Sequence, residues 1–281
     1  MPNVVLSYLQ AESILAGKKA GKSSLAVSLD LGLTRSEVSI DATGVTFPNA
    51  ERLTWNDLDA IRGSETKCFV VEQNALREIR TFSRETDRVY SLMPGPSAPT
   101  LLLSGISMHR IKNANPHDDT LSKIRAAAPM TGRVLDTATG LGYTAIEAAR
   151  TAEQVITVEL DPAVLDVARQ NPWSKALFDN PRISQRIGDS FAVIQQFDDE
   201  AFTRVVHDPP TFSLAGELYS GEFYRQAFRV LRRGGRLFHY IGNPETRSGH
   251  AVTAGVIRRL QDAGFTRVVR RPEAFGVVAY K

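Results

Sequence analysis

Two short stretches combine acids with residues that shape the backbone, and both follow runs that predict buried β-strands. The first begins at Asp136, which ends the apolar run 133–136, and continues through Gly140 and Gly142. Glycines at this spacing let the backbone turn tightly and approach a ligand closely. Glu159 ends the next apolar run, 17 residues after Gly142, at the usual place of a carboxylate that accepts both hydroxyls of a ribose. The pattern predicts a site for an adenosine-containing cofactor.

Two other interpretations of the glycine turn stay open. The glycines could merely close a turn between a strand and a helix, with Glu159 as a solvated strand end. A nicotinamide dinucleotide is also a candidate, because Gly140-x-Gly142-x-x-Ala145 fits its fingerprint. Asp136 argues against that ligand, since its carboxylate would face a pyrophosphate. A carboxylate there suits a cationic amino group, such as that of a methionine moiety.

The second stretch follows the apolar run 203–208 and reads Asp208-Pro209-Pro210-Thr211-Phe212. Proline has a carbonyl but no N–H, so the aspartate and the two prolines offer only hydrogen-bond acceptors. Such a cluster could hold both N–H bonds of an exocyclic amino group while the nitrogen lone pair faces an electrophile. Asp208 could then accept or relay the departing proton. The alternative interpretation is a rigid loop start without chemistry.

Strands and helices alternate in the part of the chain that carries both stretches. Apolar runs predict strands at 133–136, 154–160, 182–187, 203–208 and 235–241, and helical patterns fall at 143–152, 162–170, 190–196, 217–232 and 250–263. This alternation predicts an α/β fold with a mostly parallel sheet. The last two runs, 265–270 and 275–280, predict an antiparallel pair that closes the sheet. Ligands bind beyond the carboxyl ends of such strands, where both stretches lie.

The first third of the chain has a different pattern. A short helix at 8–17 and apolar residues that alternate between 25 and 47 predict a small α+β domain. Three prolines within 93–99 forbid a helix and remove ladder donors. We therefore expect a linker there, with a small domain at 1–95, possible substrate presentation as its role, and a catalytic domain at 96–281.

The charge of the chain is nearly balanced, with 34 Lys+Arg against 31 Asp+Glu and a formal net charge of +3. Positive charge is nevertheless concentrated late, because residues 229–271 hold ten arginines and no lysine. Late arginines could form a phosphate-binding rim that faces RNA, although scattered surface charge needs no such explanation. The arginines in question are Arg232, Arg233, Arg236, Arg258, Arg259, Arg267, Arg270 and Arg271.

The first stretch, Asp136-x-Ala138-x-Gly140-x-Gly142, resembles the first motif of the class I S-adenosylmethionine-dependent methyltransferases. Ala138 stands where that family usually has its first glycine. The resemblance implies a Rossmann-like, seven-stranded methyltransferase sheet with S-adenosyl-L-methionine as cofactor. It also implies that Asp136, Ala138, Gly140 and Gly142 hold the methionine part and that Glu159 binds the ribose.

Two further positions match this family. Asp189 and Ser190, after the third predicted strand, occupy the place whose acid meets the adenine amino group. His109 lies in a stretch that resembles the segment before the first motif, which often covers the cofactor. A strand end with a satisfied histidine is the alternative at that position.

The stretch after 203–208 resembles the Asp/Asn-Pro-Pro-aromatic motif of methyltransferases that act on amino groups, and the whole pattern resembles a group of archaeal-type RNA N-methyltransferases. The resemblance implies methyl transfer to an exocyclic amino group of a base in ribosomal or transfer RNA. Cytidine N4 is the preferred target and guanosine N2 the next. The residues implied to be catalytic are Asp208, Pro209, Pro210 and Phe212.

Two other function classes stay open. An aminopropyltransferase that uses decarboxylated S-adenosylmethionine on a polyamine would share the fold, but it would be expected to have an acidic diamine channel, and the late arginines speak against one. A non-catalytic RNA-binding protein is the third possibility, disfavoured because the cofactor acids and Asp208 are all present.

The remaining composition sets limits. A single cysteine, Cys68, excludes an intramolecular disulfide. It also favours nitrogen as methyl acceptor, because methylation of pyrimidine carbon generally needs a thiolate and Cys68 lies outside the predicted catalytic domain. His207 and His239 lack the spacing of a metal pair, so no metal is expected. Without a secretory leader or an apolar run of about 18 residues, a cytoplasmic location is expected.

Overall fold

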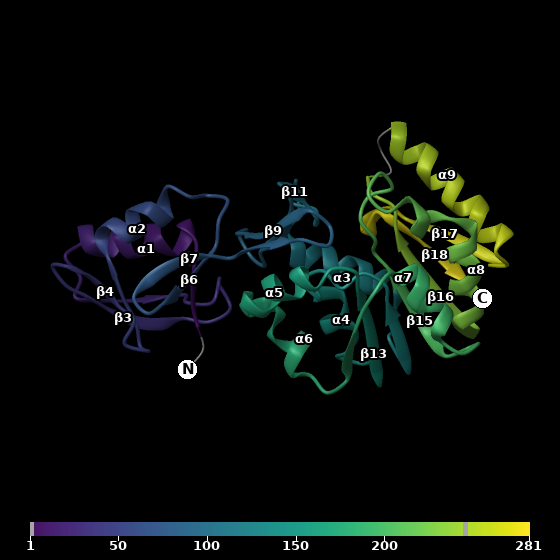
Figure 1. The fold of residues 1–281 in the computed structure, drawn as a ribbon, viewed down its shortest axis with the longest axis horizontal. Coiled ribbons are helices and arrows are strands. Elements are labelled where there is room, and N and C mark those ends of the chain that lie inside the picture. The colour runs from purple at the N-terminus through teal and green to yellow at the C-terminus, as the bar shows by residue number, and fades with distance from the viewer. Residues whose placement is uncertain (1–2, 244–246) are drawn as a thin grey trace. The chain divides into compact units, whose positions relative to one another are not determined.

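The computed structural model describes residues 3–243 and 247–281. Contacts within the chain divide it into two compact units (Figure 1). The first comprises Met1–His117 and Ala163–Lys175, and the second comprises Asp118–Pro162 and Ala176–Lys281.

The second unit is built on a seven-stranded sheet with the order β14-β13-β12-β15-β16-β18-β17. Its strands are β12 (Arg133–Asp136), β13 (Gln154–Glu159), β14 (Ile183–Ile187), β15 (Phe202–His207), β16 (Leu231–Tyr240), β17 (Arg267–Arg271) and β18 (Gly276–Tyr280). Only β18 runs antiparallel to its neighbours, and the other pairings are parallel. The predicted Rossmann-like, mostly parallel α/β sheet with an antiparallel pair at one end is confirmed.

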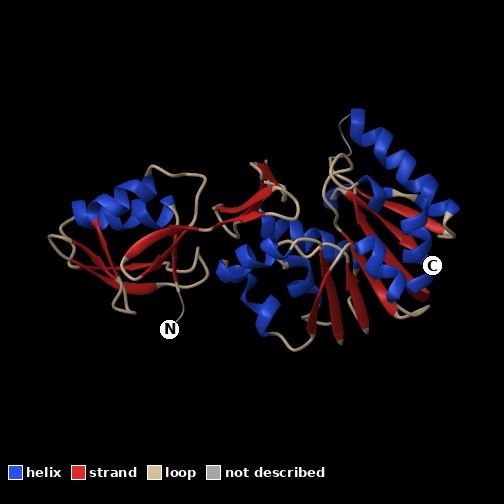
Figure 2. Ribbon diagram, in the orientation of Figure 1, coloured by secondary structure: helices blue, strands red, loops and turns tan. Residues whose placement is uncertain are grey.

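Helices connect these strands, as Figure 2 shows in blue. They are α3 (Pro116–Ala127), α4 (Tyr143–Ala148), α5 (Pro162–Gln170), α6 (Lys175–Asp179), α7 (Ser190–Val193), α8 (Gly221–Val230) and α9 (Arg247–Asp262), with short 3-10 helices η1 (Pro172–Ser174), η2 (Ile194–Gln196), η3 (Gly216–Tyr219) and η4 (Pro272–Ala274). The helix expected at 217–232 is divided because Ser220 caps α8, its hydroxyl accepting from the Phe223 N–H at 3.1 Å. The sequence analysis did not predict α3, which carries Asp119 and Lys123.

The core of the second unit lies between the central strands and the helices α8 and α9. All six residues of β15 are buried, as expected of a strand with neighbours on both sides. On α8, Phe223, Ala227 and Val230 are buried at a spacing that places them on one face. They pack against Leu260 of α9 and Leu237 of β16, so the carboxyl ends of the strands rest on a rigid scaffold.

The first unit contains three small antiparallel sheets, with the orders β1-β6-β7, β2-β3-β4-β5 and β11-β10-β9-β8. The elements are β1 (Val4–Leu6), α1 (Tyr8–Lys19), β2 (Ser24–Val27), β3 (Ser36–Ile40), β4 (Gly44–Thr46), β5 (Arg52–Thr54), α2 (Trp55–Arg62), β6 (Phe69–Glu72), β7 (Ala75–Glu78), β8 (Arg80–Ser83), β9 (Arg88–Met93), β10 (Thr100–Leu103) and β11 (Ile106–Ser107). The helix and the hairpins expected before residue 50 are therefore present. Ser7 starts α1 through a capping box, in which the Gln10 side chain accepts from the Ser7 N–H at 2.9 Å.

The proline-rich segment 93–99 differs from the expected linker. It joins β9 to β10, which pair antiparallel with Thr100 opposite Met93, and the compact unit that contains it continues to His117. Prolines suit this position because a hairpin connection needs no ladder donors there. Substrate presentation by residues 1–95 stays a prediction.

Cys68 is fully buried in the first unit, and burial raises the pKa of its thiol. A thiol with a raised pKa is a poor nucleophile. Within the described residues, every helix is too short or too polar to span a bilayer.

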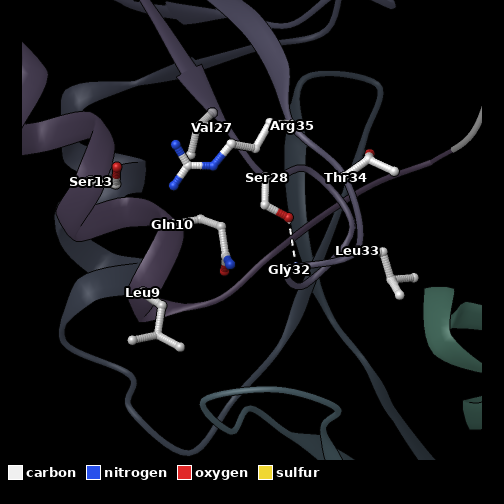
Figure 3. A pocket seen from close by; sticks show the side chains of 9 residues that line it. All are labelled: Leu9, Gln10, Ser13, Val27, Ser28, Gly32, Leu33, Thr34 and Arg35. Carbon is white, nitrogen blue, oxygen red and sulfur yellow. Dashed lines mark hydrogen bonds between the residues drawn. The ribbon is translucent and has the colours of Figure 1, made fainter.

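The first unit also has a pocket of about 370 Å³ (Figure 3). Its lining comes from α1 and from the segment around β2 and the loop after it: Leu9, Gln10, Ser13, Val27, Ser28, Gly32, Leu33, Thr34 and Arg35. Arg35 is the one charged side chain in this lining. The lining therefore contains no carboxylate.

Candidate active site

The candidate site lies at the carboxyl edge of the sheet in the second unit. Asp136 ends β12 and Glu159 ends β13. The loop that begins with Asp208 follows β15, and Tyr240 ends β16. Because neighbouring parallel strands end at the same edge, the fold brings these side chains from distant parts of the sequence to one edge.

The turn after β12 depends on its glycines. Gly140 and Gly142 have φ angles of 52° and 78°, in the left-handed region that favours glycine. A Cβ atom at Gly142 would lie only 2.7 Å from the Leu177 side chain. The Gly142 N–H donates to Thr139 O at 2.7 Å and closes the turn. The predicted tight turn is present, and Ala138 lies within it.

Asp136 is fully buried and only partly satisfied. Its Oδ2 accepts from the hydroxyls of Thr144 at 3.1 Å and Thr157 at 2.9 Å. Its Oδ1 has no hydrogen-bond partner among the described residues. Burial raises the pKa of Asp136 to about 7; the two hydroxyls and the Ala138 N–H oppose that rise, and the charge of Asp208 adds to it. An unpaired buried oxygen costs about 1–3 kcal/mol, so this one suits a cationic N–H donor from a ligand.

Glu159 is held by backbone groups. Its Oε2 accepts from the Gly140 N–H at 2.8 Å and its Oε1 from the Asp161 N–H at 3.2 Å. Burial raises the pKa of Glu159 to about 7, and these N–H groups oppose the rise. The bonds join the end of β13 to the glycine turn. Its role as the ribose ligand stays a prediction.

The other predicted cofactor residues have different surroundings. Asp189 caps α7 by accepting from the Phe191 N–H at 2.9 Å, and the buried Ser190 donates to Thr137 O at 2.6 Å. They tie the end of β14 to the turn after β12. His109 belongs to the first unit, where its Nδ1 lies 2.9 Å from Thr100 Oγ1. Contacts of Asp189, Ser190 and His109 with a cofactor stay predictions.

In the loop after β15, one of the hydrogen-bond acceptors that the sequence predicted to be free already has a partner. Pro210 was expected to offer a free carbonyl, but it already accepts from the Tyr219 hydroxyl at 3.0 Å. Burial raises the pKa of Tyr219, so the hydroxyl keeps its proton. Phe212 is 53% exposed and touches the ring of Tyr219 edge-on, with centroids 5.5 Å apart. Pro209 is buried, and Asp208 beside it is partly buried.

The sequence analysis missed a lysine and an acid that complete the site. Lys123, on α3, is 2% exposed, and its Nζ lies 2.6 Å from Asp208 Oδ2 and 2.8 Å from Asp119 Oδ2. Nζ also lies 4.3 Å from the centroid of the Tyr240 ring. The i,i+4 spacing of Asp119 and Lys123 was a possible signal, but such pairs usually lie on exposed helix faces, and nothing in the sequence placed this one against β15.

The ion pair sets the charges. Burial alone would lower the pKa of Lys123, but Asp208 and Asp119 outweigh it and raise the pKa above its usual value. Burial also raises the pKa of Asp208, and the Lys123 ammonium opposes that rise. Asp119 and Asp208 contact the Lys123 ammonium, and the charge of Asp136 interacts with that of Asp208, so three carboxylates and one ammonium give the edge a formal excess of negative charge. Such an edge favours cationic ligands.

Two buried histidines form a wall behind this edge. His207 Nε2 lies 2.9 Å from the Leu218 carbonyl, which can only accept, so Nε2 carries the proton and Nδ1 accepts from the Thr137 hydroxyl at 2.6 Å. Burial lowers the pKa of His207 to about 3 and that of His239 well below its usual value. Both stay neutral and structural. No group of potential metal ligands occurs among the described residues.

Several late arginines are used within the protein. Arg236 donates to Ala128 O at 2.6 Å, and its guanidinium lies 5.1 Å from the centroid of the Tyr280 ring. Arg267 lies 5.3 Å from the same centroid. Arg259 donates to Tyr219 O at 2.9 Å. These arginines have structural partners and do not weigh against a cationic substrate.

Three comparisons with known proteins bear on this site. The family model of the spermine/spermidine synthase domain matches residues 134–262. An uncharacterized protein of Methanocaldococcus jannaschii is 42% identical over 286 residues, which cover 99% of this chain and 97% of that protein. The polyamine aminopropyltransferase of Mycobacterium tuberculosis is 36% identical over 99 residues, which cover 33% of this chain but only 19% of that protein.

A solved structure agrees at the level of the fold. Spermidine synthase from Thermotoga maritima matches with a TM-score of 0.56 at 19% identity, covering 74% of this chain and 75% of that chain. The class I methyltransferase-like fold expected from the glycine turn is therefore confirmed.

The expectation of an RNA N-methyltransferase is wrong, as are RNA methylation and rRNA processing as roles and ribosomal or transfer RNA as partner. The chain matches the spermine/spermidine synthase domain and part of the mycobacterial polyamine aminopropyltransferase instead. The error has a physical source. A carboxylate beside proline carbonyls recognises the N–H bonds of an amine, and an aliphatic amine presents such bonds as well as cytidine N4 or guanosine N2 does.

Proposed function

We propose that this chain, which belongs to the same family as the uncharacterized protein of Methanocaldococcus jannaschii, is an enzyme that transfers an aminopropyl group to an amine nitrogen of a polyamine. The observation that carries the proposal is the extent of the synthase-domain match, 134–262. It contains Asp136, Glu159 and Asp208, the acids at the carboxyl edge of the sheet.

The donor in this proposal is decarboxylated S-adenosylmethionine. It supplies an aminopropyl carbon on a sulfonium, and that sulfonium leaves as a neutral thioether when an amine displaces it. The residues at the glycine turn fit such a group, because Asp136 Oδ1 is buried without a hydrogen-bond partner in the described part of the chain and would accept from the donor's ammonium. Gly140 and Gly142 add no side chain to the turn, and Glu159 would accept from the ribose hydroxyls.

The acceptor amine belongs at Asp208 in this proposal. The amine must be neutral to attack, and its nitrogen becomes an ammonium once the new C–N bond forms and the C–S bond breaks. Asp208 lies at the edge with 18% of its side chain exposed, so it can take a proton from the nitrogen and pass it to solvent. The rings of His207 and His239 are both fully buried, so they keep water away from the protein side of this site.

The charge at the edge favours the decarboxylated donor over S-adenosyl-L-methionine itself. Asp119, Asp136 and Asp208 outnumber the Lys123 ammonium, so a donor that brought its own carboxylate would add a fourth negative group. Methyl transfer from S-adenosyl-L-methionine to an amine is the second candidate. It is supported by the methyltransferase-like sheet and by the first motif at Asp136.

A donor exchange tests the proposal. The full chain is incubated with decarboxylated S-adenosylmethionine or with S-adenosyl-L-methionine, each with putrescine, cadaverine, spermidine or no amine. Methylthioadenosine and the amine products are then measured by mass spectrometry. We expect amine-dependent release of methylthioadenosine from the decarboxylated donor. No release with any of these amines would refute aminopropyl transfer to polyamines, and a methylated amine would support the second candidate.

A further inference from the structure

Lys123 has no part in the transfer as derived above, although its ammonium lies against the carboxylate that would take the proton. Lysine is almost never fully buried unless it is paired, and here the exposed fraction of its side chain is 2%. We infer that Lys123 is a positioning residue, which together with Asp119 holds Asp208 ionised and fixed in place for the acceptor amine. The inference rests on the proposed function for the reaction that Asp208 serves.

Three separate elements hold the ammonium in place. Asp119 lies one turn before Lys123 on α3 and contacts Nζ at 2.8 Å. Asp208, in the loop after β15, contacts it at 2.6 Å. Tyr240, at the end of β16, places its ring 4.3 Å away, within the range of a cation–π contact. With this cover, the ammonium links α3 to the ends of two adjacent strands.

Lys123 acts through Asp208 and not as a reagent. Its raised pKa, caused by Asp208 and Asp119 against the effect of burial, keeps the ammonium protonated, and an ammonium has no lone pair to attack or to accept a proton. The contact with Asp208 uses Oδ2, so Oδ1 lies outside this ion pair. One oxygen of Asp208 is therefore anchored while the side chain stays partly accessible.

The charges that face Asp208 show what removal of the lysine would do. Asp119 and Lys123 face it from α3, Asp136 from the end of β12, and the Tyr219 hydroxyl from η3. Without Lys123, the charges that face Asp208 from the described residues would be two carboxylates. Like charges at short range raise the affinity of a carboxylate for its proton, and a protonated Asp208 can no longer accept one from the amine.

Infrared titration of the full chain tests this inference without any turnover. Spectra of the wild-type protein minus those of Asp208→Asn isolate the Asp208 carboxyl band, and the same subtraction is made in a Lys123→Met background. We expect the titration midpoint of Asp208 to rise by about one pH unit or more in Lys123→Met. An unchanged midpoint in the folded variant would overturn the inference.

A double variant supplies the matched control. Asp119→Asn/Lys123→Met removes one buried charge of each sign, so it keeps the charge balance and serves the test if the single variant does not fold. We expect its Asp208 midpoint to lie above that of the wild-type protein and below that of Lys123→Met. A midpoint equal to the wild-type value in this variant and in Lys123→Met alike would show that Lys123 does not act on Asp208.

The pH profile of transfer separates positioning from simple support of the fold. We expect the acidic limb of the kcat profile to move to higher pH in Lys123→Met by the same amount as the infrared midpoint. A loss of equal size at every pH would indicate a purely structural lysine and contradict the inference. If the wild-type protein transfers no aminopropyl group, the proposed function fails, and the infrared midpoints still decide whether Lys123 controls Asp208.

Discussion

The carboxylates at the ends of β12 and β15 lie at one buried edge but have different partners. Asp136 accepts from two hydroxyls, and its other oxygen has no hydrogen-bond partner within residues 3–243 and 247–281. Asp208 holds the ammonium of Lys123. A buried carboxylate without an internal cation marks a place for a ligand's cation. When a buried carboxylate already has a cation of the protein beside it, that cation keeps the carboxylate ionised. In the proposed function, the first therefore serves binding of the donor and the second serves the transfer.

The largest effect is expected from a substitution of Asp208, and it tests the difference between the two carboxylates. Asp208→Asn keeps the shape of the side chain but removes its ability to take a proton, so the transfer rate should fall about 10²- to 10⁴-fold. Affinity for methylthioadenosine, measured by calorimetry, should change by less than about threefold, because in the proposed site its ribose is bound by Glu159 and not by Asp208. Glu222→Gln, on the exposed face of α8, is the control and should leave turnover intact. Normal turnover in Asp208→Asn would remove this residue from the mechanism.

The next effect concerns the donor. Asp136→Asn removes the negative charge that would meet the donor's ammonium, and a hydrogen bond to a charged group contributes about 1.5–3 kcal/mol. We expect KM for the decarboxylated donor to rise roughly 10- to 100-fold, with a smaller change in KM for the amine. Steady-state kinetics with each substrate varied in turn provide the measurement. A change confined to the amine would reverse the assigned roles of Asp136 and Asp208.

Asp136 should also make stability depend on pH. Its pKa is about 7 in the folded protein and about 3.9 in an unfolded chain, so the folded state binds this proton more tightly. The resulting stabilisation is complete below about pH 4 and is lost as pH rises through about 7. Asp136→Asn should therefore reduce the loss of stability between low and high pH. Part of that loss should persist because the pKa of Glu159 is also about 7. Urea unfolding at about pH 5 and about pH 8 measures it, and an unchanged pH dependence would contradict the burial of an unpaired carboxyl.

The glycine turn can be tested through its backbone. Gly142→Ala places a Cβ atom 2.7 Å from Leu177 at a φ of 78°, so the free energy of unfolding should fall by about 1–3 kcal/mol. Gly216→Ala is the matched control, because no atom lies within 4 Å of its added Cβ and its φ is not in the left-handed region. Equal stabilities of the two variants in urea unfolding would show that the turn is not constrained as described.

The smallest effect is expected at Phe212. Its ring is 53% exposed and meets Tyr219 edge-on, so Phe212→Ala should change stability by less than about 0.5 kcal/mol. We expect kcat/KM for the amine to change by less than about fivefold, or about 1 kcal/mol. A much larger loss would support the earlier prediction that Phe212 acts in catalysis.

The sequence predicted the sheet and its edge because local patterns determine both. Apolar runs identified all strands of the second unit, and the glycine turn identified the end of β12. Lys123 and Asp119 were not predicted as site residues, because their role depends on a contact with Asp208, 85 residues away from Lys123. The chemical class of a substrate could not be predicted for another reason. An acid followed by two prolines offers acceptors for N–H bonds, and this pattern does not distinguish an aromatic amino group from an aliphatic one.

The most direct test of aminopropyl transfer follows the atoms of the donor. Decarboxylated S-adenosylmethionine that carries a heavy carbon isotope in its aminopropyl chain is incubated with the full chain and putrescine. Mass spectrometry should then find the label in the amine product and none in the methylthioadenosine. Label that stays on the nucleoside, or putrescine that gains only a methyl group, would contradict the account.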